Sequence, residues 1–310
     1  MTSLSVLSQT ETEGKGKSFW TVLDTLFIDH DLEKYSARVF TNYKVKQFRI
    51  VNREDKFTYI PNNRFGVGFG VANSKAILDI AFNIKNGNKE ETHRFDAQGT
   101  VIFRNRHYFN GYLQIYNGFN IKNNFDKPDV FRGDIKSRTI GLNYLYTLSD
   151  VEFSYSLLKA GFPTRNKDVY ITYGYGGFIM FDQFSSSGTI YPETYEDPIN
   201  IRRYSAGAFG VLAGLLSAFV LPKNFIATCN VLPGIALANE KVTLQNDSYR
   251  PSNPLLYKLD VSLGLSYSIK RYYVNLLYET GVYFSDIDYD HKYRFNLSLA
   301  KLAIGYKLKV

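Results

Sequence analysis

The chain has 310 residues but only one cysteine, Cys229, so it can form no intrachain disulfide and holds no cysteine-based redox or metal motif. Long apolar runs are also missing. The longest, 206–221, falls short of the roughly 20 residues that a membrane-spanning helix needs. It contains Gly207, Gly210 and Gly214, which suit a closely packed strand better than a helix. A disulfide scaffold and a helical membrane protein are therefore excluded.

A basic block is missing as well. Lys and Arg total 37 against 29 Asp and Glu, giving a net charge of +8 and a pI near 9.2. The basic residues are scattered among acidic ones, and no run resembles a nucleic-acid-binding arm. We expect no nucleic-acid partner.

The most informative pattern that is present lies in residues 255–284. Apolar and polar residues alternate with period two, pass through a two-residue turn at 270–271, and alternate again. With this turn Ile269 lies opposite Tyr272, and every apolar residue of one strand faces an apolar residue of the other. Matching faces of this kind are typical of a continuous wall with an apolar outside and a polar inside.

Two more segments follow the same rule. Residues 65–71 and 76–82 alternate across a turn at Asn73-Ser74, and residues 140–148 and 151–157 alternate across Ser149-Asp150. Strands of about ten residues suffice to cross a bilayer when tilted. Together, 25 Tyr and 24 Phe supply residues for two interfacial aromatic girdles. A soluble β-sandwich is the alternative, but this chain would be long for one sandwich.

The fold class predicted is all-β: a transmembrane antiparallel up-and-down β-barrel of about twelve strands over residues 35–310. We assign the basic surplus to its inward-facing strand positions and to contacts with anionic outer-membrane lipid or lipopolysaccharide headgroups. Residues 1–34 are expected to form an N-terminal periplasmic tail or short helix. No signal peptide is evident in the first residues, so we expect the mature form of an exported protein. A phase change between Leu299 and Leu302 predicts a bulge at Ala300-Lys301. The expected strands are 36–50, 64–73, 75–85, 92–104, 106–117, 137–148, 151–160, 202–219, 224–238, 255–269, 271–284 and 292–310.

Segment 161–200 interrupts this regular order. If it adds no net crossing, the tight turns all lie on the periplasmic side and the segment is an outer loop; otherwise the barrel has fourteen strands. As a loop, it would offer aromatic contacts to a partner protein or surface glycan. The outer-loop interaction candidates are Tyr170, Tyr173, Tyr175, Tyr191 and Tyr195, together with Asp286, Asp288 and Asp290.

The first hundred residues carry a family resemblance. Tyr59-Ile60-Pro61-Asn62 precedes the Gly-alternating strand Gly66-Val67-Gly68-Phe69-Gly70, and Tyr204-Ser205-Ala206-Gly207 follows farther on. With these motifs the chain resembles a family of uncharacterised outer-membrane β-barrels of Bacteroidota, a domain of unknown function. The resemblance implies the fold and a bacterial outer-membrane location. It implies no activity, catalytic residue or cofactor.

Catalytic and metal motifs are sparse. The four histidines are His30, His93, His107 and His291, and His291 follows Asp286, Asp288 and Asp290 in an expected outer loop. Their spacing is similar to the start of a calcium loop, but His291 stands where the turn glycine is needed. We expect a solvated acidic loop tip, with no metal, no cofactor and no enzymatic activity. An outer-membrane hydrolase is a minor alternative.

Two function classes remain, and the lumen distinguishes them. The inward faces are expected to interleave charges of both signs with bulky groups, which can cross-link and close the bore of such a barrel. This favours a structural or accessory subunit of an envelope complex over a passive channel for small solutes. The polar residues expected to face the lumen are Arg64, Asp79, Arg94, Asp96, Lys258, Asp260, Arg271, Asn275 and Glu279.

Overall fold

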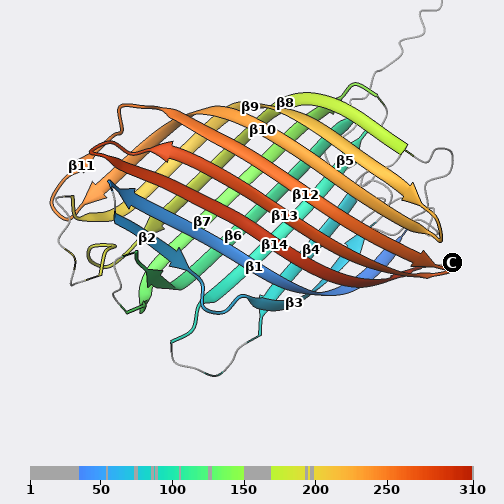
Figure 1. Ribbon diagram of the computed structural model, residues 1–310, viewed down its shortest axis with the longest axis horizontal. Helices are drawn as coiled ribbons and strands as arrows, with labels where there is room; N and C mark the ends of the chain where they lie inside the picture. Colours follow the sequence, from blue (N-terminus) through green and yellow to red (C-terminus); the bar gives the residue numbers. More distant parts are fainter. Residues whose placement is uncertain are drawn as a thin grey trace, which may run out of the picture.

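The computed structural model describes residues 35–53, 55–72, 76–84, 87, 90–104, 106–124, 128–149, 169–192, 195 and 199–308. The regular elements of this part of the chain are all β-strands (Figure 1). No helix in it is long and apolar enough to span a membrane. The strands are β1 (Ser36–Asn52), β2 (Asp55–Ile60), β3 (Phe65–Ala72), β4 (Ala76–Asn83), β5 (His93–Phe103), β6 (His107–Lys122), β7 (Val130–Thr147), β8 (Val169–Ser185), β9 (Ile201–Leu221), β10 (Phe225–Leu244), β11 (Ser248–Tyr249), β12 (Leu255–Ile269), β13 (Tyr272–Asp286) and β14 (His291–Lys307).

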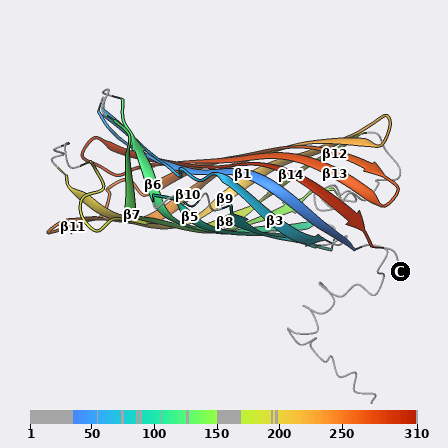
Figure 2. The same ribbon diagram turned by 90° about the horizontal axis from the view of Figure 1, so that it is seen from below.

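The sheet closes on itself, because β1 pairs with the last strand, β14, on one edge and with β3 on the other. All pairings are antiparallel, and only the short β2 and β11 lie off the ring. The remaining twelve described strands form an up-and-down barrel, as predicted. It is narrower in Figure 2 than in Figure 1, so its cross-section is flattened.

The barrel has two unlike ends. β1 begins and β14 ends at the same end, on the right in Figure 1, which we call the terminal end. The tight turns at 222–224 and 270–271 also lie there, and Lys223, Asn224 and Lys270 adopt the positive φ angles that such turns need. The opposite end, which carries β2, β11 and the longer connections, is the loop end.

Two of the three predicted hairpins are confirmed. In β12 and β13, Ile269 is paired with Tyr272 and Leu265 with Leu276, which is the register expected from matching apolar faces. In β3 and β4 the apolar faces match as predicted, but the register does not: a two-residue turn at Asn73-Ser74 would pair Phe69 with Leu78, and Phe69 is paired with Ile80. Alternation with period two determines the faces, because a slip of one residue turns every apolar side chain into the lumen, whereas a slip of two residues leaves the faces unchanged.

The third predicted hairpin is wrong. Both edges of β7 are already occupied, by β6 on one side and β8 on the other. Segment 151–160, the expected partner, lies outside the described residues. The wall strand that follows β7 is β8, so segment 161–200 is not simply an outer loop: part of it is wall. The predicted number of twelve wall strands is still correct, because β8 occupies the position that was predicted for 151–160.

The predicted bulge is also wrong. The pairing of β14 with β1 and β13 is unbroken from Leu299 through Leu302. The phase of the apolar pattern changes because Leu299 is buried inside the barrel, whereas Leu302 is exposed on its outside. Apolar residues thus line part of the lumen.

The sheet branches toward the loop end. β1 pairs with β3 up to Tyr43, but from Phe48 onward its partner is β2. On the other side β6 leaves β5 after Asn117 and pairs with β2 from Asn120. β2 therefore replaces β3, β4 and β5, and ten of the described strands form the ring near the loop end.

The motif Tyr59-Ile60-Pro61-Asn62 lies at this branch. Polar side chains there satisfy backbone groups that the branching leaves without ladder partners. Asn63 Nδ2 donates to Ile84 O at 2.7 Å, and Thr92 Oγ1 donates to Gly118 O at 2.9 Å. Gly118 has a φ of 87° and marks the register shift of β6, where a Cβ would meet the Phe131 ring at 2.7 Å. The motif thus joins the narrower ring to the wider one.

The wall has an apolar outer face. Along β1 and β8, exposed and buried residues alternate, and the exposed set is largely apolar. Exposed Tyr173 and Tyr272 lie near the terminal end, whereas Tyr257 and Phe284 lie nearer the loop end. We call the apolar band between them the apolar belt: it includes Val39, Val67, Phe69, Val71, Leu78, Ile140, Leu142, Ile171, Ile179, Phe209, Val211, Leu237, Leu259, Leu263, Leu265, Leu276, Leu302 and Ile304.

Candidate functional site: the barrel lumen

The inside of the barrel is built from ion pairs that cross from strand to strand. Nearest the terminal end, the carboxylate of Asp79 lies between two cations. Arg38 Nη2 approaches Asp79 Oδ1 at 2.7 Å and Lys301 Nζ approaches Oδ2 at 2.6 Å. The Lys301 ammonium also lies 4.6 Å from the centroid of the Phe40 ring. All three charged side chains are buried, so this cluster joins β1, β4 and β14 across the lumen face.

A second cluster is centred on Asp96 of β5. Lys44 Nζ lies 2.9 Å from Asp96 Oδ1, and the Arg94 guanidinium lies 3.8 Å from Oδ2. Arg94 also donates to Asn42 Oδ1 at 2.8 Å and to Arg64 O at 2.9 Å. The cluster holds β5 against β1 at the level where the sheet branches.

The third pair is the most deeply buried. Lys46 Nζ lies 3.2 Å from Asp182 Oδ1, and neither side chain has any exposed surface. Thr139 Oγ1 donates to Asp182 Oδ1 at 2.5 Å, and Tyr293 Oη donates to Oδ2 at 2.6 Å. Lys46 also donates to Thr139 Oγ1. Because β1, β7, β8 and β14 each contribute a member, the network spans the bore.

Stacked aromatic rings fill the bore on the loop side of Lys46. The Phe48 ring lies parallel to Tyr59 at 4.3 Å and to Phe184 at 5.0 Å. Farther around the bore, Tyr204 contacts Tyr293 at 4.5 Å. We call the set the aromatic plug: Phe48, Phe57, Tyr59, Phe119, Phe184, Tyr204, Tyr293 and Phe295, all buried.

The segment after β8 folds over the plug. Tyr191 is buried against Phe57, with ring centroids 5.0 Å apart, and Tyr59 Oη donates to Ile190 O at 3.2 Å. Arg132 donates to the backbone oxygens of Thr189 and Tyr191 at 3.2 and 3.3 Å. Backbone as well as side chains of this segment therefore cover the plug at the loop end.

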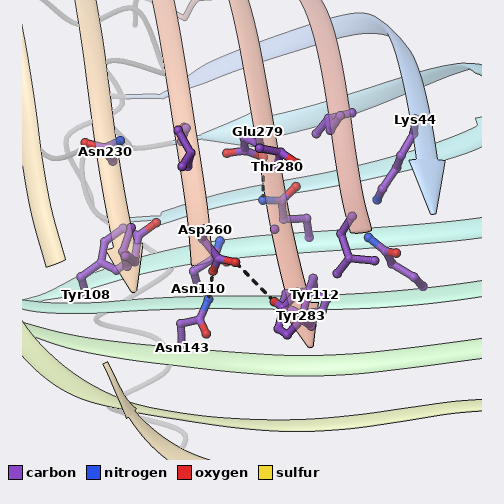
Figure 3. Close-up of a pocket in the computed structure, with 18 of the residues that line it drawn as sticks. Lys44, Tyr108, Asn110, Tyr112, Asn143, Asn230, Asp260, Glu279, Thr280 and Tyr283 are labelled. Carbon is purple, nitrogen blue, oxygen red and sulfur yellow. Dashed lines mark hydrogen bonds between the residues drawn. The ribbon is translucent and has the colours of Figure 1, made fainter. Parts of the chain in front are cut away.

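On the terminal side of the plug lies a cavity of about 110 Å³. Figure 3 shows Asp260, Asn143 and Tyr283 turned toward it from three strands. Lys258 Nζ lies 2.9 Å from Asp260 Oδ2 and 4.6 Å from the centroid of the Phe178 ring. Lys258 also donates to Asn143 Oδ1.

Other groups around the cavity are bonded to each other across it. Tyr112 Oη and Tyr283 Oη are 2.9 Å apart, and Gln98 Nε2 donates to Glu279 Oε2 at 3.2 Å. Leu216, Leu232, Leu297 and Leu299 are among the apolar residues of the lining. A chamber of this size has room for a few water molecules, and the donors and acceptors in its lining give such waters partners.

Seven of the nine residues predicted to face the lumen do so: Asp79, Arg94, Asp96, Lys258, Asp260, Asn275 and Glu279. Arg64 does not. It precedes β3, and its guanidinium donates to Tyr43 Oη at 2.7 Å on the outer face. Arg271 lies exposed in the turn at the terminal end and donates to Tyr306 Oη at 3.1 Å. Strand alternation does not govern either residue, because each lies outside a strand.

The predicted outer-loop tyrosines are placed differently. Tyr170, Tyr173 and Tyr175 belong to β8 near the terminal end: Tyr170 is buried, and the other two are exposed on the wall. Tyr191 and Tyr195 do lie in the loop-end segment, but they pack inward. Tyr191 is fully buried, and Tyr195 Oη donates to Asp55 Oδ2 at 2.7 Å. These tyrosines form wall and plug, and the prediction of a free aromatic contact surface is wrong.

The three acidic candidates do lie at the loop end, at and after the end of β13. Asp288 accepts hydrogen bonds from Ser252, Asp286 accepts one from the Asp288 amide, and Asp290 pairs with Arg53 at 3.2 Å. In the described part of the chain, no group of three or more His, Cys, Asp or Glu residues is arranged to hold a metal ion.

Asp182, Lys301 and Tyr293 were missed at the sequence level. Asp182 belongs to β8, in a segment for which an outer loop and additional strands were both open alternatives, and Lys301 lay in the expected bulge. Extending the alternation of 169–185 to its end would have found Asp182. Its partner Lys46 lies 136 positions away in the sequence, so the strand pattern does not predict that the two residues pair.

Comparison with known proteins places the chain in a family. Residues 22–309 match the family described as Domain of unknown function (DUF4421). The chain belongs to this family. The Tyr59-Ile60-Pro61-Asn62 motif and the aromatic plug of this DUF4421 member lie within the matched range. No curated protein matches the chain.

Among solved structures, the chain is similar to the β-domain of the Bordetella autotransporter BrkA, at 11% identity and a TM-score of 0.42, covering 89% of this chain and 100% of that one. It is also similar to the translocator domain of the autotransporter NalP from Neisseria meningitidis, at 10% identity and a TM-score of 0.43. This match covers 93% of this chain and 92% of that one. The match to an outer membrane channel from Pseudomonas putida F1 has 7% identity and a TM-score of 0.34, and it covers 88% of this chain and 94% of that one. These similarities concern the barrel fold alone.

Proposed function

We propose that this DUF4421 protein is a bacterial outer-membrane β-barrel that conducts no solute and catalyses no reaction, and that serves as a structural or accessory subunit of an envelope complex. The observation that carries the proposal is the closed bore. The Lys46–Asp182 network crosses it, and the aromatic plug fills the half beyond. A barrel sealed in this way can act on other molecules only through its wall and its two ends.

The apolar belt supports the membrane location. A continuous apolar outer face of this extent is far larger than the patches that soluble monomers expose. Tyr and Phe at its two borders have the positions of interfacial girdles. Tight turns at the terminal end and longer connections at the loop end support a periplasmic terminal end. The outer wall would then contact membrane lipid, and its rims the lipid and lipopolysaccharide headgroups.

The passive channel was the alternative. The 110 Å³ cavity lies in the half of the bore toward the terminal end, and the plug separates it from the loop end. Planar-bilayer recording of the refolded protein tests this directly. We expect no steady conductance. Large, uniform single-channel steps would contradict the closed-bore proposal and favour a diffusion pore.

The described histidines offer little support for hydrolysis. His107 Nδ1 lies 2.9 Å from Tyr144 Oη on the wall, and buried His291 bonds through Nδ1 to Tyr289 O at 2.6 Å. We expect the purified protein to leave phospholipid and peptide substrates intact. Turnover that is lost in a His107→Ala or His291→Ala variant with an intact barrel would contradict a non-enzymatic role.

The accessory role is tested by co-purification. The tagged protein is extracted from native outer membranes in mild detergent, cross-linked, and its neighbours are identified by mass spectrometry. We expect a reproducible envelope protein in stoichiometric amount. A barrel that migrates alone at its monomer mass, with and without cross-linking, would contradict the role of a complex subunit.

A further inference from the structure

Two arginines lie directly opposite each other on the outer wall. Arg49 of β1 is paired with Arg294 of β14, at positions whose side chains point away from the lumen. The same cross-strand row continues to Phe284 on one side and through Thr58 to Lys122 on the other. Three cations and a hydroxyl therefore lie in one line across four neighbouring strands.

No acidic residue in the described part of the chain pairs with either arginine. The nearest polar contact of Arg294 is Nε to Asn296 Oδ1, at 3.3 Å. The Arg294 guanidinium lies 4.7 Å from the centroid of the Phe284 ring. The Arg49 guanidinium faces the Gln47 side-chain amide, whose oxygen accepts from Nη2 at 2.6 Å and from Nε at 2.7 Å. Like charges directly opposite in a sheet are destabilising, and an anion bound at this pair would remove that cost.

The row lies at the border of the apolar belt that is nearest the loop end. Tyr257 and Phe284, at the border of the apolar belt nearest the loop end, are paired with each other and belong to this row. The next outward positions toward the terminal end on β1 and β14, Gln47 and Asn296, are polar, and the belt begins beyond them. In a membrane, this is the level of the headgroups and not of the acyl chains.

We infer that Arg49 and Arg294 bind a phosphate group of an outer-leaflet glycolipid. The inference rests on the proposed membrane location and deepens it by naming a lipid site. Guanidinium groups present planar forks that match phosphate oxygens, and a phosphate with up to two negative charges neutralises both arginines at once. Phe284 is exposed beside the pair and can contact the attached sugar. Free inorganic phosphate shares this chemistry, but the position at the belt border commits the site to a lipid.

The test uses the full-length barrel, refolded in phosphate-free detergent, and native mass spectrometry. The probes are diphosphorylated lipid A, its dephosphorylated form, and inorganic phosphate. We expect retention of the diphosphorylated form alone. The double variant Arg49→Gln/Arg294→Gln should lower its affinity by about tenfold or more, because hydrogen bonds to a charged group are lost. Equal retention of the dephosphorylated lipid, or phosphate binding that lipid A does not displace, would overturn the site.

The matched control removes two cations from another part of the same rim. Lys136 and Arg138 of β7 are exposed on the outer face, and Lys136→Gln/Arg138→Gln changes the net charge equally. If this control weakened lipid A binding as much, general electrostatics would explain the affinity and the site would be refuted. Arg49→Lys/Arg294→Lys keeps the charge and should bind at an intermediate level, which covers the case in which the glutamine variant fails to fold.

The outcome is separable from that of the proposed function. Heat-modifiable gel mobility shows whether each variant is a folded barrel, and bilayer recording shows whether the bore is closed. A folded, non-conducting barrel that does not distinguish the lipids refutes the site alone. A conducting barrel that still selects diphosphorylated lipid A refutes the closed bore and leaves the site standing.

Discussion

Asn62 and Thr92 form a reciprocal pair of hydrogen bonds at the point where the sheet branches. The Thr92 amide donates to Asn62 Oδ1 at 2.8 Å, and the Asn62 amide donates to Thr92 Oγ1 at 3.0 Å. The two residues follow β2 and precede β5, which have no ladder pairing with each other. Side chains therefore supply hydrogen bonds that neighbouring strands would normally supply.

Replacing Thr92 with valine should lower the free energy of unfolding by about 1–3 kcal/mol, because a fully buried hydroxyl that bonds two backbone groups is lost. Urea unfolding of the lipid-reconstituted barrel measures the change. Thr243→Val is the control: Thr243 has no side-chain hydrogen bond to a described residue and should tolerate valine. Equal stability of both variants would show that the branch does not depend on Thr92.

Removing one member of the Lys46–Asp182 pair should be costly. Asp182→Ala leaves a fully buried ammonium without its carboxylate, which should destabilise the barrel by about 3–5 kcal/mol. The double variant Lys46→Met/Asp182→Ala removes both charges and should be more stable than Asp182→Ala alone. The single variant Lys46→Met is measured as well. A double-mutant cycle from urea unfolding gives the coupling energy. Additive losses would mean that the two charges do not stabilise each other.

Gly305 allows an aromatic ring to lie against the sheet. Tyr273 is paired with it, and a Cβ at this position would meet the Tyr273 ring at 2.0 Å. Gly305→Ala should therefore displace the ring and lower the free energy of unfolding by about 1–3 kcal/mol, as overpacking does. At exposed Gly207, a Cβ meets nothing within 4 Å, so Gly207→Ala should change stability little. Similar effects at both glycines would contradict this account.

The two faces of β12 should respond oppositely to one charge. Leu263→Lys places an ammonium on the apolar belt and should cost about 2–4 kcal/mol near the membrane midplane, or prevent assembly. Ser262→Lys points into the cavity beside Asp260 and Glu279, where the charge is compensated, and should be mild. Heat-modifiable gel mobility and urea unfolding compare the two. Equal tolerance would refute a membrane-facing outer wall.

The sequence by itself was sufficient for the two faces of most wall strands. Alternation with period two placed Leu263 outside and Ser262 inside, and the two-residue turn at 270–271 set the register of β12–β13. These features are local, because each depends on neighbours along one strand or across one tight turn, and a slip by one residue would invert every side chain. The polar lumen residues inside strands, such as Asp79 and Asn275, followed from the same rule. The rule misplaced Arg64 and Arg271 because neither lies in a strand: Arg64 precedes β3, and Arg271 lies in the turn after β12.

Only the tertiary structure decided which segments meet. Ring closure made β8, and not 151–160, the neighbour of β7, and this brought Asp182 to Lys46. The branch at Asn62 and Thr92 and the outer pairing of Arg49 with Arg294 likewise join residues far apart in the chain. Such contacts depend on the stagger of all the strands around a closed ring, which no single segment encodes. The ion-pair network inside the barrel and the pairing of Arg49 with Arg294 are therefore properties of the assembled barrel.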